Sequence, residues 1–286
     1  MIISELIKEA TIQLMNASIP QPRFEAEILL DDILKCGRVY LYSHSDDPVS
    51  EETVKKYRGF IERRKQHEPA AYILGKKEFM GMDFYVDHSV LIPRPDTETI
   101  VDSVLKTLSN DSYEILDLCT GSGAIGLSIK KQYPEVKMTL SDISPDALKI
   151  AEKNAEMHHL DVTLVQSDLL SDMNEENFDL IVSNPPYIPT QVIKGLESDV
   201  RDYEPHLALD GGNDGFDLYQ KIIDQSLDCL KNRGYLMFEA GDGQAEELAS
   251  RMKKAGFTIT IFDKDLIGMV RAVGGYKNPD KEEQSV

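Results

Sequence analysis

The feature that most constrains the fold of this chain is an alternation of apolar runs and helical patterns that begins near residue 114. The apolar runs have the length and composition of buried strands. They lie at residues 114–118, 138–140, 162–165, 178–182 and 235–238. Helical patterns follow from residue 124, from 145, over 217–230 and from 244. Such alternation requires right-handed crossovers, so it predicts an α/β fold with a mostly parallel sheet.

The end of the chain predicts how this sheet is completed. The apolar stretches 257–262 and 269–273 indicate a closing pair of strands, which brings the expected sheet to seven strands. Residues 277–286 are polar and are expected to form a tail.

The N-terminal part of the chain shows a helical pattern instead. Pro22 opens a run that stops before Gly37, and Ser50 precedes another, so a small helical bundle is expected. Short apolar groups come next. Tyr72 with Ile73, Phe79, and residues 84–86 are expected as strands, and residues 96–108 as a helix. We therefore expect a helical domain for partner recognition at residues 1–75, a β-hairpin linker at 76–95 and an α/β domain at 96–286.

The formal net charge of −19 bears on the class of partner. Nonspecific nucleic-acid affinity comes mainly from Lys and Arg that neutralise phosphates, so no direct nucleic-acid binding is expected. The charge suits a small molecule or a basic protein surface, although an acid excess can also serve solubility alone. Three scattered cysteines form no disulfide framework, and no apolar run reaches the ~18 residues that span a membrane. We expect a cytoplasmic monomer with no signal peptide, no membrane association and no metal site.

A glycine loop joins the first strand of the α/β part to the next helix. It reads Cys119-Thr120-Gly121-Ser122-Gly123-Ala124-Ile125-Gly126, and its glycines match the dinucleotide-binding fingerprint. Asp142 ends the following strand, about 20 residues on, where a carboxylate can accept both hydroxyls of a ribose. An NAD-dependent enzyme and an S-adenosylmethionine-dependent enzyme both need these contacts, so the loop leaves both open. Asp142 could also be a helix cap, and Cys119 is interpreted as a packing residue.

Two further acids favour S-adenosylmethionine over a dinucleotide. Asp117 lies just before the loop, where it could orient the loop or meet an ammonium group, but would repel a pyrophosphate. Asp168 follows the third strand and can accept a hydrogen bond from an adenine amino group. Three acids around one ligand suit a cation.

A second motif follows the strand at residues 178–182. It consists of Asn184, Pro185, Pro186 and Tyr187. Ligands of open α/β sheets bind beyond the carboxyl ends of strands, so this turn should face the same crevice as the glycine loop. The Asn184 side-chain oxygen and the Pro185 carbonyl can hold the two hydrogens of an amide nitrogen, while prolines stiffen the turn. Tyr187 offers a face for a planar group. Methyl transfer to a planar nitrogen is therefore expected, with Asn184, Pro185 and Tyr187 as catalytic residues.

With both motifs in place, the chain resembles class I (Rossmann-like) methyltransferases that act on amino groups, and in particular the release factor glutamine methyltransferases (the HemK or PrmC family). The resemblance covers nearly the whole chain. It is carried also by residues 69–75, 91–98, 199–205 and 207–212. The first and last of these blocks are not general methyltransferase features, so the resemblance is specific.

The resemblance implies S-adenosylmethionine as cofactor and, as methyl acceptor, the glutamine in the Gly-Gly-Gln loop of class 1 peptide chain release factors. The implied cofactor-binding residues are Asp117, Thr120, Gly121, Ser122, Gly123, Ala124, Asp142, Asp168, Leu169 and Asn184. The implied substrate-binding residues are Asn184, Pro185, Pro186, Tyr187, Leu91 and Arg94. Two residues depart from the family pattern: Cys119 replaces a frequent glycine, and Leu169 stands where an aromatic can stack on adenine. A DNA or RNA adenine methylase and a nonenzymatic binding module remain as alternatives.

Overall fold

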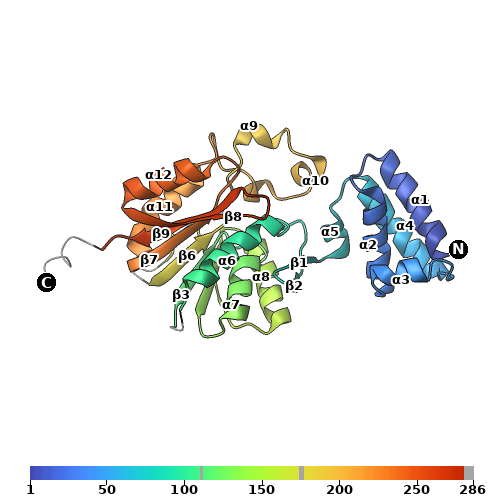
Figure 1. The fold of residues 1–286 in the computed structure, drawn as a ribbon, viewed down its shortest axis with the longest axis horizontal. Coiled ribbons are helices and arrows are strands. Elements are labelled where there is room, and N and C mark those ends of the chain that lie inside the picture. Colours follow the sequence, from blue (N-terminus) through green and yellow to red (C-terminus); the bar gives the residue numbers. More distant parts are fainter. Residues whose placement is uncertain (110–111, 174–176, 280–286) are drawn as a thin grey trace. The chain divides into compact units, whose positions relative to one another are not determined.

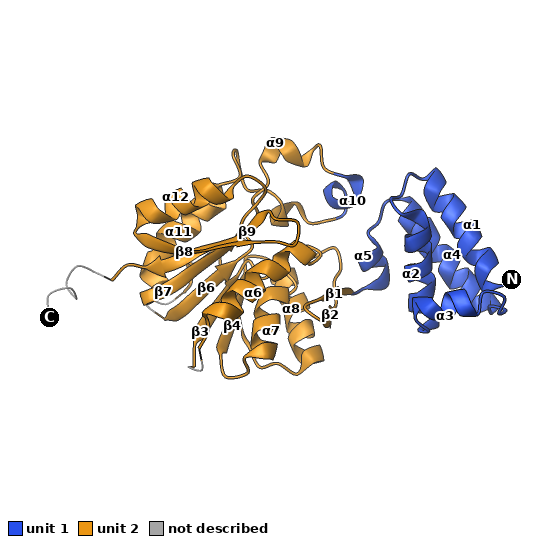
Figure 2. Cartoon of the chain, in the orientation of Figure 1, with its two compact units in different colours: residues 1–76, 197–203 blue, residues 77–196, 204–286 orange. Residues whose placement is uncertain are grey.

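The chain forms two compact units in a computed structural model that describes residues 1–109, 112–173 and 177–279 (Figure 1). The first unit comprises residues 1–76 together with 197–203, and the second comprises residues 77–196 and 204–286 (Figure 2). Within the described ranges, no helix has both the length and the apolar character needed to cross a membrane.

The first unit is a bundle of helices. Its elements are α1 (Ile3–Asn16), α2 (Pro22–Leu34), α3 (Arg38–Ser43), α4 (Glu51–Lys65), α5 (Ala70–Leu74) and α10 (Ser198–Arg201). The expected start signals are confirmed, since Pro22 opens α2 and the Ser50 hydroxyl caps α4 by accepting from Thr53 N. Tyr57 is buried in the bundle core and its hydroxyl donates to the Ala26 carbonyl at 2.9 Å. The helix α3 was not expected from the sequence.

The expected strand at Tyr72 and Ile73 is wrong. Both residues lie in α5, where they are buried, and Gly75 ends this helix in the left-handed conformation with φ of 67°. An aromatic next to a β-branched residue before a glycine suits a strand locally, but packing in the bundle decides for one helical turn.

A distant segment of the chain completes the bundle. Arg64 on α4 is only 3 % exposed, and its guanidinium donates to Glu25 at 3.0 Å and to Asp199 at 2.8 Å. The Tyr203 hydroxyl donates to the Gln66 carbonyl at 2.7 Å. Residues 197–203 therefore belong to the helical unit, although they follow residue 196 of the other unit in sequence.

The second unit is the expected α/β structure with a seven-stranded sheet. The strand order is β5-β4-β3-β6-β7-β9-β8. The strands are β3 (Glu114–Leu118), β4 (Lys137–Asp142), β5 (Thr163–Gln166), β6 (Phe178–Ser183), β7 (Leu230–Glu239), β8 (Phe257–Lys264) and β9 (Val270–Lys277). Strands β3 to β7 pair in parallel, and β9 runs antiparallel between β7 and β8. Lys277, expected in the polar tail, is the last residue of β9, and residues 280–286 lie outside the described residues.

Helices cover both faces of this sheet (Figure 1). One face packs against α6 (Glu98–Thr107), α7 (Ala124–Gln132) and α8 (Pro145–His158), and the other against α11 (Asp217–Cys229) and α12 (Ala245–Ala255). Short elements complete the unit. These are the hairpin β1 (Lys77–Phe79) and β2 (Met82–Phe84), the 3₁₀ turns η1 (Pro95–Thr97) and η2 (His206–Ala208), and α9 (Thr190–Ile193).

The strand order places a crevice at the centre of the sheet. The chain moves outward from β3 through β4 to β5, and then returns to place β6 on the other side of β3. The carboxyl ends of β3, β4 and β6 thus meet at a switch point, where open α/β sheets bind ligands. Numbered from β3, the order is 3-2-1-4-5-7-6, which differs from the dinucleotide-binding order 3-2-1-4-5-6 by the inserted antiparallel strand.

Candidate active site

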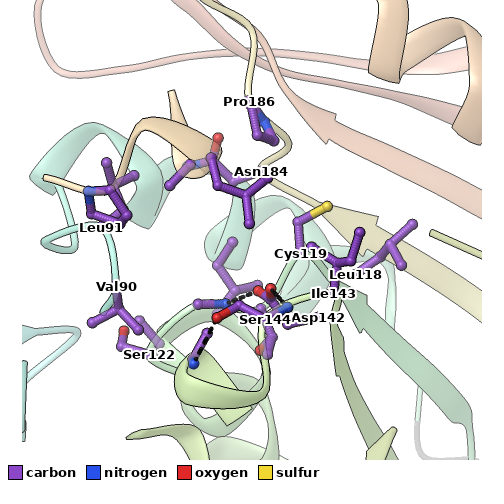
Figure 3. Close-up of a pocket in the computed structure, with 18 of the residues that line it drawn as sticks. Val90, Leu91, Leu118, Cys119, Ser122, Asp142, Ile143, Ser144, Asn184 and Pro186 are labelled. Atoms are coloured by element: carbon purple, nitrogen blue, oxygen red, sulfur yellow. Dashed lines mark hydrogen bonds between the residues drawn. The ribbon is translucent and has the colours of Figure 1, made fainter. Parts of the chain in front are cut away.

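A cavity of about 190 Å³ lies at this switch point (Figure 3). Its walls come from the glycine loop, the ends of β4 and β6, the segment before α6 and the segment around η2. Among its lining residues are Leu91, Arg94, Thr97, Cys119, Thr120, Gly121, Ser122, Ala124, Asp142, Ile143, Asp168, Leu169, Asn184, Pro186, Leu207 and Ala208. The structure thus brings together residues that are up to about 120 positions apart in sequence.

Asp117 orients the glycine loop from beneath. Its side chain is fully buried, and one carboxylate oxygen accepts from the Thr120 hydroxyl at 2.6 Å and from Gly126 N at 2.9 Å. The other oxygen has no hydrogen-bond partner among the described residues. Burial raises the pKa of Asp117 to about 7, although the hydrogen bonds from Thr120 and Gly126 act in the opposite direction and lower it. Asp117 does not line the cavity, so these contacts support the first of its two anticipated roles, orientation of the loop.

The loop itself needs left-handed backbone at several positions. Gly121 and Gly123 have φ of 55° and 82°, values that side chains with a Cβ rarely adopt. Cys119 has φ of 60°, which explains why glycine suits this position. Burial raises the pKa of the Cys119 thiol, so it stays protonated and behaves as a packing group beside the cavity.

Asp142 connects the loop to the end of β4. One carboxylate oxygen accepts from Gly121 N and the other from Ser144 N, both at 2.9 Å. Ser144 is the cap of α8, because its hydroxyl accepts from Ala147 N. Each Asp142 oxygen has two lone pairs and can therefore accept one further hydrogen bond from a ligand in the cavity. Burial raises the pKa of Asp142, which the bonds from Ser144 and Gly121 oppose.

The third acid lies at a more open position. Asp168 is exposed, whereas its neighbour Leu169 is only 7 % exposed and has a left-handed φ of 53°. Ile143 lies directly after Asp142, lines the same cavity and is 45 % exposed. Ile143 and Leu169 are thus aliphatic lining residues, each next in sequence to one of the acids that line the cavity.

The catalytic motif begins where β6 ends. The Ser183 hydroxyl donates to the Leu118 carbonyl at 2.7 Å and so fixes the end of β6 to the end of β3. Asn184 follows at once, and Figure 3 shows its side chain over the cavity, on the side opposite Asp142. No described residue hydrogen-bonds to the Asn184 side chain or donates to the Pro185 carbonyl, so both acceptors are available to a ligand.

The motif residues differ in their access to the cavity. Asn184 and Pro186 line it, whereas Pro185 and Tyr187 do not. The Tyr187 hydroxyl donates to Glu239 at 3.3 Å. The stacking role expected for Tyr187 stays a prediction. In the structure its ring is held through the hydroxyl, which is bonded to Glu239.

Leu91 and Arg94, which the resemblance implies as substrate-binding residues, lie in the segment before α6. Both line the cavity. Arg94 forms an ion pair with Glu204, which is 5 % exposed and also accepts from Ile92 N at 3.3 Å. Glu204 thus orients the segment that carries both residues.

Sequence reasoning gave no role to Asn154, which connects two walls of the site. Asn154 is fully buried on α8, and its amide donates to the Ser122 carbonyl at 2.8 Å and the Tyr85 carbonyl at 3.0 Å. Its oxygen accepts from Tyr85 N at 2.7 Å. An asparagine inside a helical pattern gives no local signal of such a contact. Leu207 and Ala208, by contrast, lie within residues 207–212, one of the sequence blocks that carry the family resemblance.

Known families match both parts of the chain. The PrmC N-terminal domain family matches residues 5–75, and the methyltransferase small domain family matches residues 97–196. A release factor glutamine methyltransferase of Geobacter sulfurreducens is 42 % identical over 92 % of this chain and 92 % of that protein. One of Clostridium botulinum is 39 % identical over 97 % of this chain and its own full length.

Solved structures share the fold of the α/β unit. A methyltransferase from Pyrococcus furiosus matches 69 % of this chain and 90 % of its own, with a TM-score of 0.53 and 19 % identity. The catalytic domain of hMettl16, solved with the MAT2A 3′UTR hairpin 6, matches 81 % of this chain and 84 % of its own, with a TM-score of 0.56 and 18 % identity. At these identities the likeness concerns the fold alone, and it confirms the expected class I methyltransferase architecture.

Proposed function

The chain belongs to the release factor glutamine methyltransferase family, and from that premise we propose that it transfers a methyl group from S-adenosylmethionine to a glutamine side-chain nitrogen of a class 1 peptide chain release factor. The observation that carries the proposal is the pair of free acceptors at the end of β6. The Asn184 side chain and the Pro185 carbonyl have no partner among the described residues, and they adjoin the cavity at the carboxyl ends of β3, β4 and β6.

The cavity residues fit S-adenosylmethionine. Asp142 would hold the ribose hydroxyls with its remaining lone pairs, and Asp168 would accept from the adenine amino group. Ile143 and Leu169 would pack against the adenine, and the backbone of residues 120–124 would follow the methionyl part. The acids suit the positive charge of this ligand. Bound S-adenosylmethionine supplies an electrophilic methyl group on a sulfonium.

The turn at residues 184–187 would prepare the acceptor nitrogen. A glutamine amide has two N–H donors, and Asn184 Oδ1 and the Pro185 carbonyl would accept one each. Held in this way, the nitrogen is oriented toward the cofactor side of the cavity, and charge that develops on it meets two fixed dipoles. The methylated nitrogen then loses its proton readily, so no strong general base is required. Leu91 and Arg94 would lie on the substrate side of the cavity.

The other parts of the chain have proposed roles that follow from the substrate. The helical unit, expected at residues 1–75 and observed with residues 197–203 added, would recognise the release factor. A net charge of −19 supports contact with a basic protein surface rather than with phosphates. We also propose that the enzyme acts as a monomer and in the cytoplasm.

Two alternatives have less support. The adenine amino group presents the same two hydrogens to Asn184, so the motif alone does not exclude a nucleic-acid methylase. Family membership and the charge favour glutamine. A dinucleotide-dependent enzyme has less support for two reasons. The antiparallel strand β9 departs from the dinucleotide-binding strand order, and the Asp117 carboxylate, which is bonded to the glycine loop, would repel a pyrophosphate.

The test is a methylation assay with a defined acceptor. Purified enzyme, S-adenosylmethionine and a class 1 release factor are incubated, and tryptic peptides are analysed by mass spectrometry. We expect a gain of one methyl group on the Gly-Gly-Gln peptide and none on a release factor whose loop glutamine is replaced. Equal methylation of both factors, or preferred methylation of RNA or DNA offered in parallel, would overturn the proposal.

A further inference from the structure

Glu239 is a buried carboxylate directly beside the catalytic turn. It is the last residue of β7, whose Phe238 pairs with Ser183 at the end of β6. Glu239 is only 2 % exposed and does not line the cavity. Keeping a carboxylate away from water costs free energy unless its oxygens are well paired. Its position therefore calls for an explanation beyond packing.

The contact that Glu239 makes leads to the catalytic motif. Its Oε1 accepts a hydrogen bond from the Tyr187 hydroxyl at 3.3 Å, and its Oε2 has no hydrogen-bond partner among the described residues. Burial raises the pKa of Glu239 to about 7 and the charge of Asp96 adds to this, while Thr97, Arg271 and Tyr187 oppose it.

The surroundings of Tyr187 allow it little movement. A Cβ at Gly211 would lie 2.6 Å from Tyr187 Cα, and a Cβ at Gly241 would lie 2.8 Å from its ring. The Gln244 amide donates to the Tyr187 carbonyl at 3.1 Å. Backbone and ring of Tyr187 are thus packed on several sides, and the hydroxyl is the one part of the side chain with a polar anchor. Anything that fixes Tyr187 also fixes the turn that begins three residues earlier.

We infer that Glu239 is a positioning residue for methyl transfer, which holds the Tyr187 hydroxyl and thereby keeps Asn184 and the Pro185 carbonyl at the spacing of an amide. This inference rests on the proposed function. Tyr187 acts in it as an anchor of the turn, because its ring lies outside the cavity lining. Misplacement of reacting groups by about 1 Å can lower a rate about 100-fold, so a buried anchor affects turnover strongly.

Three substitutions separate this role from simple packing. Glu239→Leu removes the acceptor but retains bulk, Glu239→Gln retains an acceptor oxygen, and Tyr187→Phe removes only the hydroxyl. We expect Glu239→Leu and Tyr187→Phe each to lower kcat about 10- to 100-fold with KM for S-adenosylmethionine changed less than about threefold. Glu239→Gln should retain most of kcat, and the double variant Glu239→Leu with Tyr187→Phe should be no worse than the poorer single variant.

Asp179 provides the matched control. It lies near the start of β6, the strand whose end leads into the catalytic turn, and it accepts from Glu114 N at 2.8 Å and from Lys231 at 2.9 Å. Asp179→Asn should lower the melting temperature without lowering kcat. Thermal melting is recorded for each variant, so that kcat is compared among folded proteins. If Glu239→Leu does not fold, Tyr187→Phe alone decides, and an unchanged kcat overturns the inference.

The outcomes also distinguish this inference from the proposed function. Absence of methyl transfer by the unmodified enzyme refutes the proposed function. Transfer that persists at full kcat in Glu239→Leu, or losses that multiply in the double variant, refutes the role of Glu239 and leaves the function standing.

Discussion

The carboxylate of Asp142 accepts a hydrogen bond from the backbone N–H of Gly121 at 2.9 Å. This bond joins the end of β4 to the glycine loop that follows the neighbouring strand β3. The acid that would hold a ribose and the loop that would follow the methionyl part are thus preorganised as one structure, which limits the ordering that a ligand must induce.

Removal of the Asp142 carboxylate should weaken cofactor binding. We expect Asp142→Ala to raise the Kd for S-adenosylmethionine about 10- to 150-fold, since hydrogen bonds to charged groups contribute ~1.5–3 kcal/mol. Isothermal titration calorimetry measures this directly. Asp146→Ala is the control, because Asp146 lies one turn away on α8 and its side chain is 64 % exposed beside Lys149. Equal affinity in the two variants would contradict the assignment of the ribose site to Asp142.

Loss of the Asn184 acceptor should affect the chemical step rather than cofactor binding. We expect Asn184→Ala to lower kcat about 100- to 1000-fold, comparable to removing one preorganised polar group from an active site. The Kd for S-adenosylmethionine should change little. Asn184→Asp retains an acceptor oxygen and should lose less activity. Single-turnover methylation of a release factor provides the rates, and a kcat of Asn184→Ala near that of the unmodified enzyme would show that the turn does not hold the nitrogen.

The stability of the α/β unit should depend on pH through Asp117. Its pKa is raised by burial from 3.8 to about 7. Between about pH 4 and 7 the folded state therefore holds a proton that the unfolded state has lost, and the free energy of unfolding falls as the pH rises.

Asparagine cannot ionise, so Asp117→Asn should lack this dependence. Relative to the unmodified protein, the variant should gain about 2–3 kcal/mol between pH 5 and 8, at ~1.4 kcal/mol per pKa unit. Urea unfolding at the two pH values measures it. If the free energy of unfolding changes with pH by the same amount in both proteins, Asp117 does not hold a proton in the folded state.

Gly126 should resist substitution for reasons of packing alone. It lies in α7, and a Cβ there would overlap the Leu140 side chain and come within 3.0 Å of the Asp117 carboxylate. We expect Gly126→Ala to lower the free energy of unfolding by about 1–3 kcal/mol. Gly59→Ala is the matched control in α4, where nothing lies within 4 Å of a Cβ, and it should increase stability by up to about 1 kcal/mol. Chemical denaturation compares the two, and a stable Gly126→Ala would mean that the loop and β4 can separate.

Much of the fold could be predicted because the signals are local. The strand at 114–118 and the helix starts at Ala124 and Pro145 agree with the structure, since apolar runs, glycine turns and the Ser144 cap act within a few residues. Tyr72 and Ile73 were assigned to a strand because their local preference favours one, whereas burial in the bundle core imposes a helical turn. The small elements between residues 190 and 208 have no periodic pattern to reveal them.

The candidate site could be predicted where backbone topology determines it. Asp142 ends one strand and Asn184 follows another, and the carboxyl ends of neighbouring parallel strands lie at the same edge of the sheet. Asn154 and Glu239 could not be found in this way. Each acts on a residue more than 30 positions away, through a contact that only the packed fold creates.

The segment at residues 197–203 has an evolutionary consequence. The buried Arg64 of the bundle has its partner Asp199 in a stretch of chain that interrupts the methyltransferase sequence. A gene fusion that adds residues 1–76 ahead of another methyltransferase would bring the Arg64 guanidinium without Asp199, although its contacts with Glu25 and the Glu68 carbonyl would come with it. A transfer of the bundle that keeps its full set of contacts therefore requires two separate stretches of the chain, residues 1–76 and 197–203.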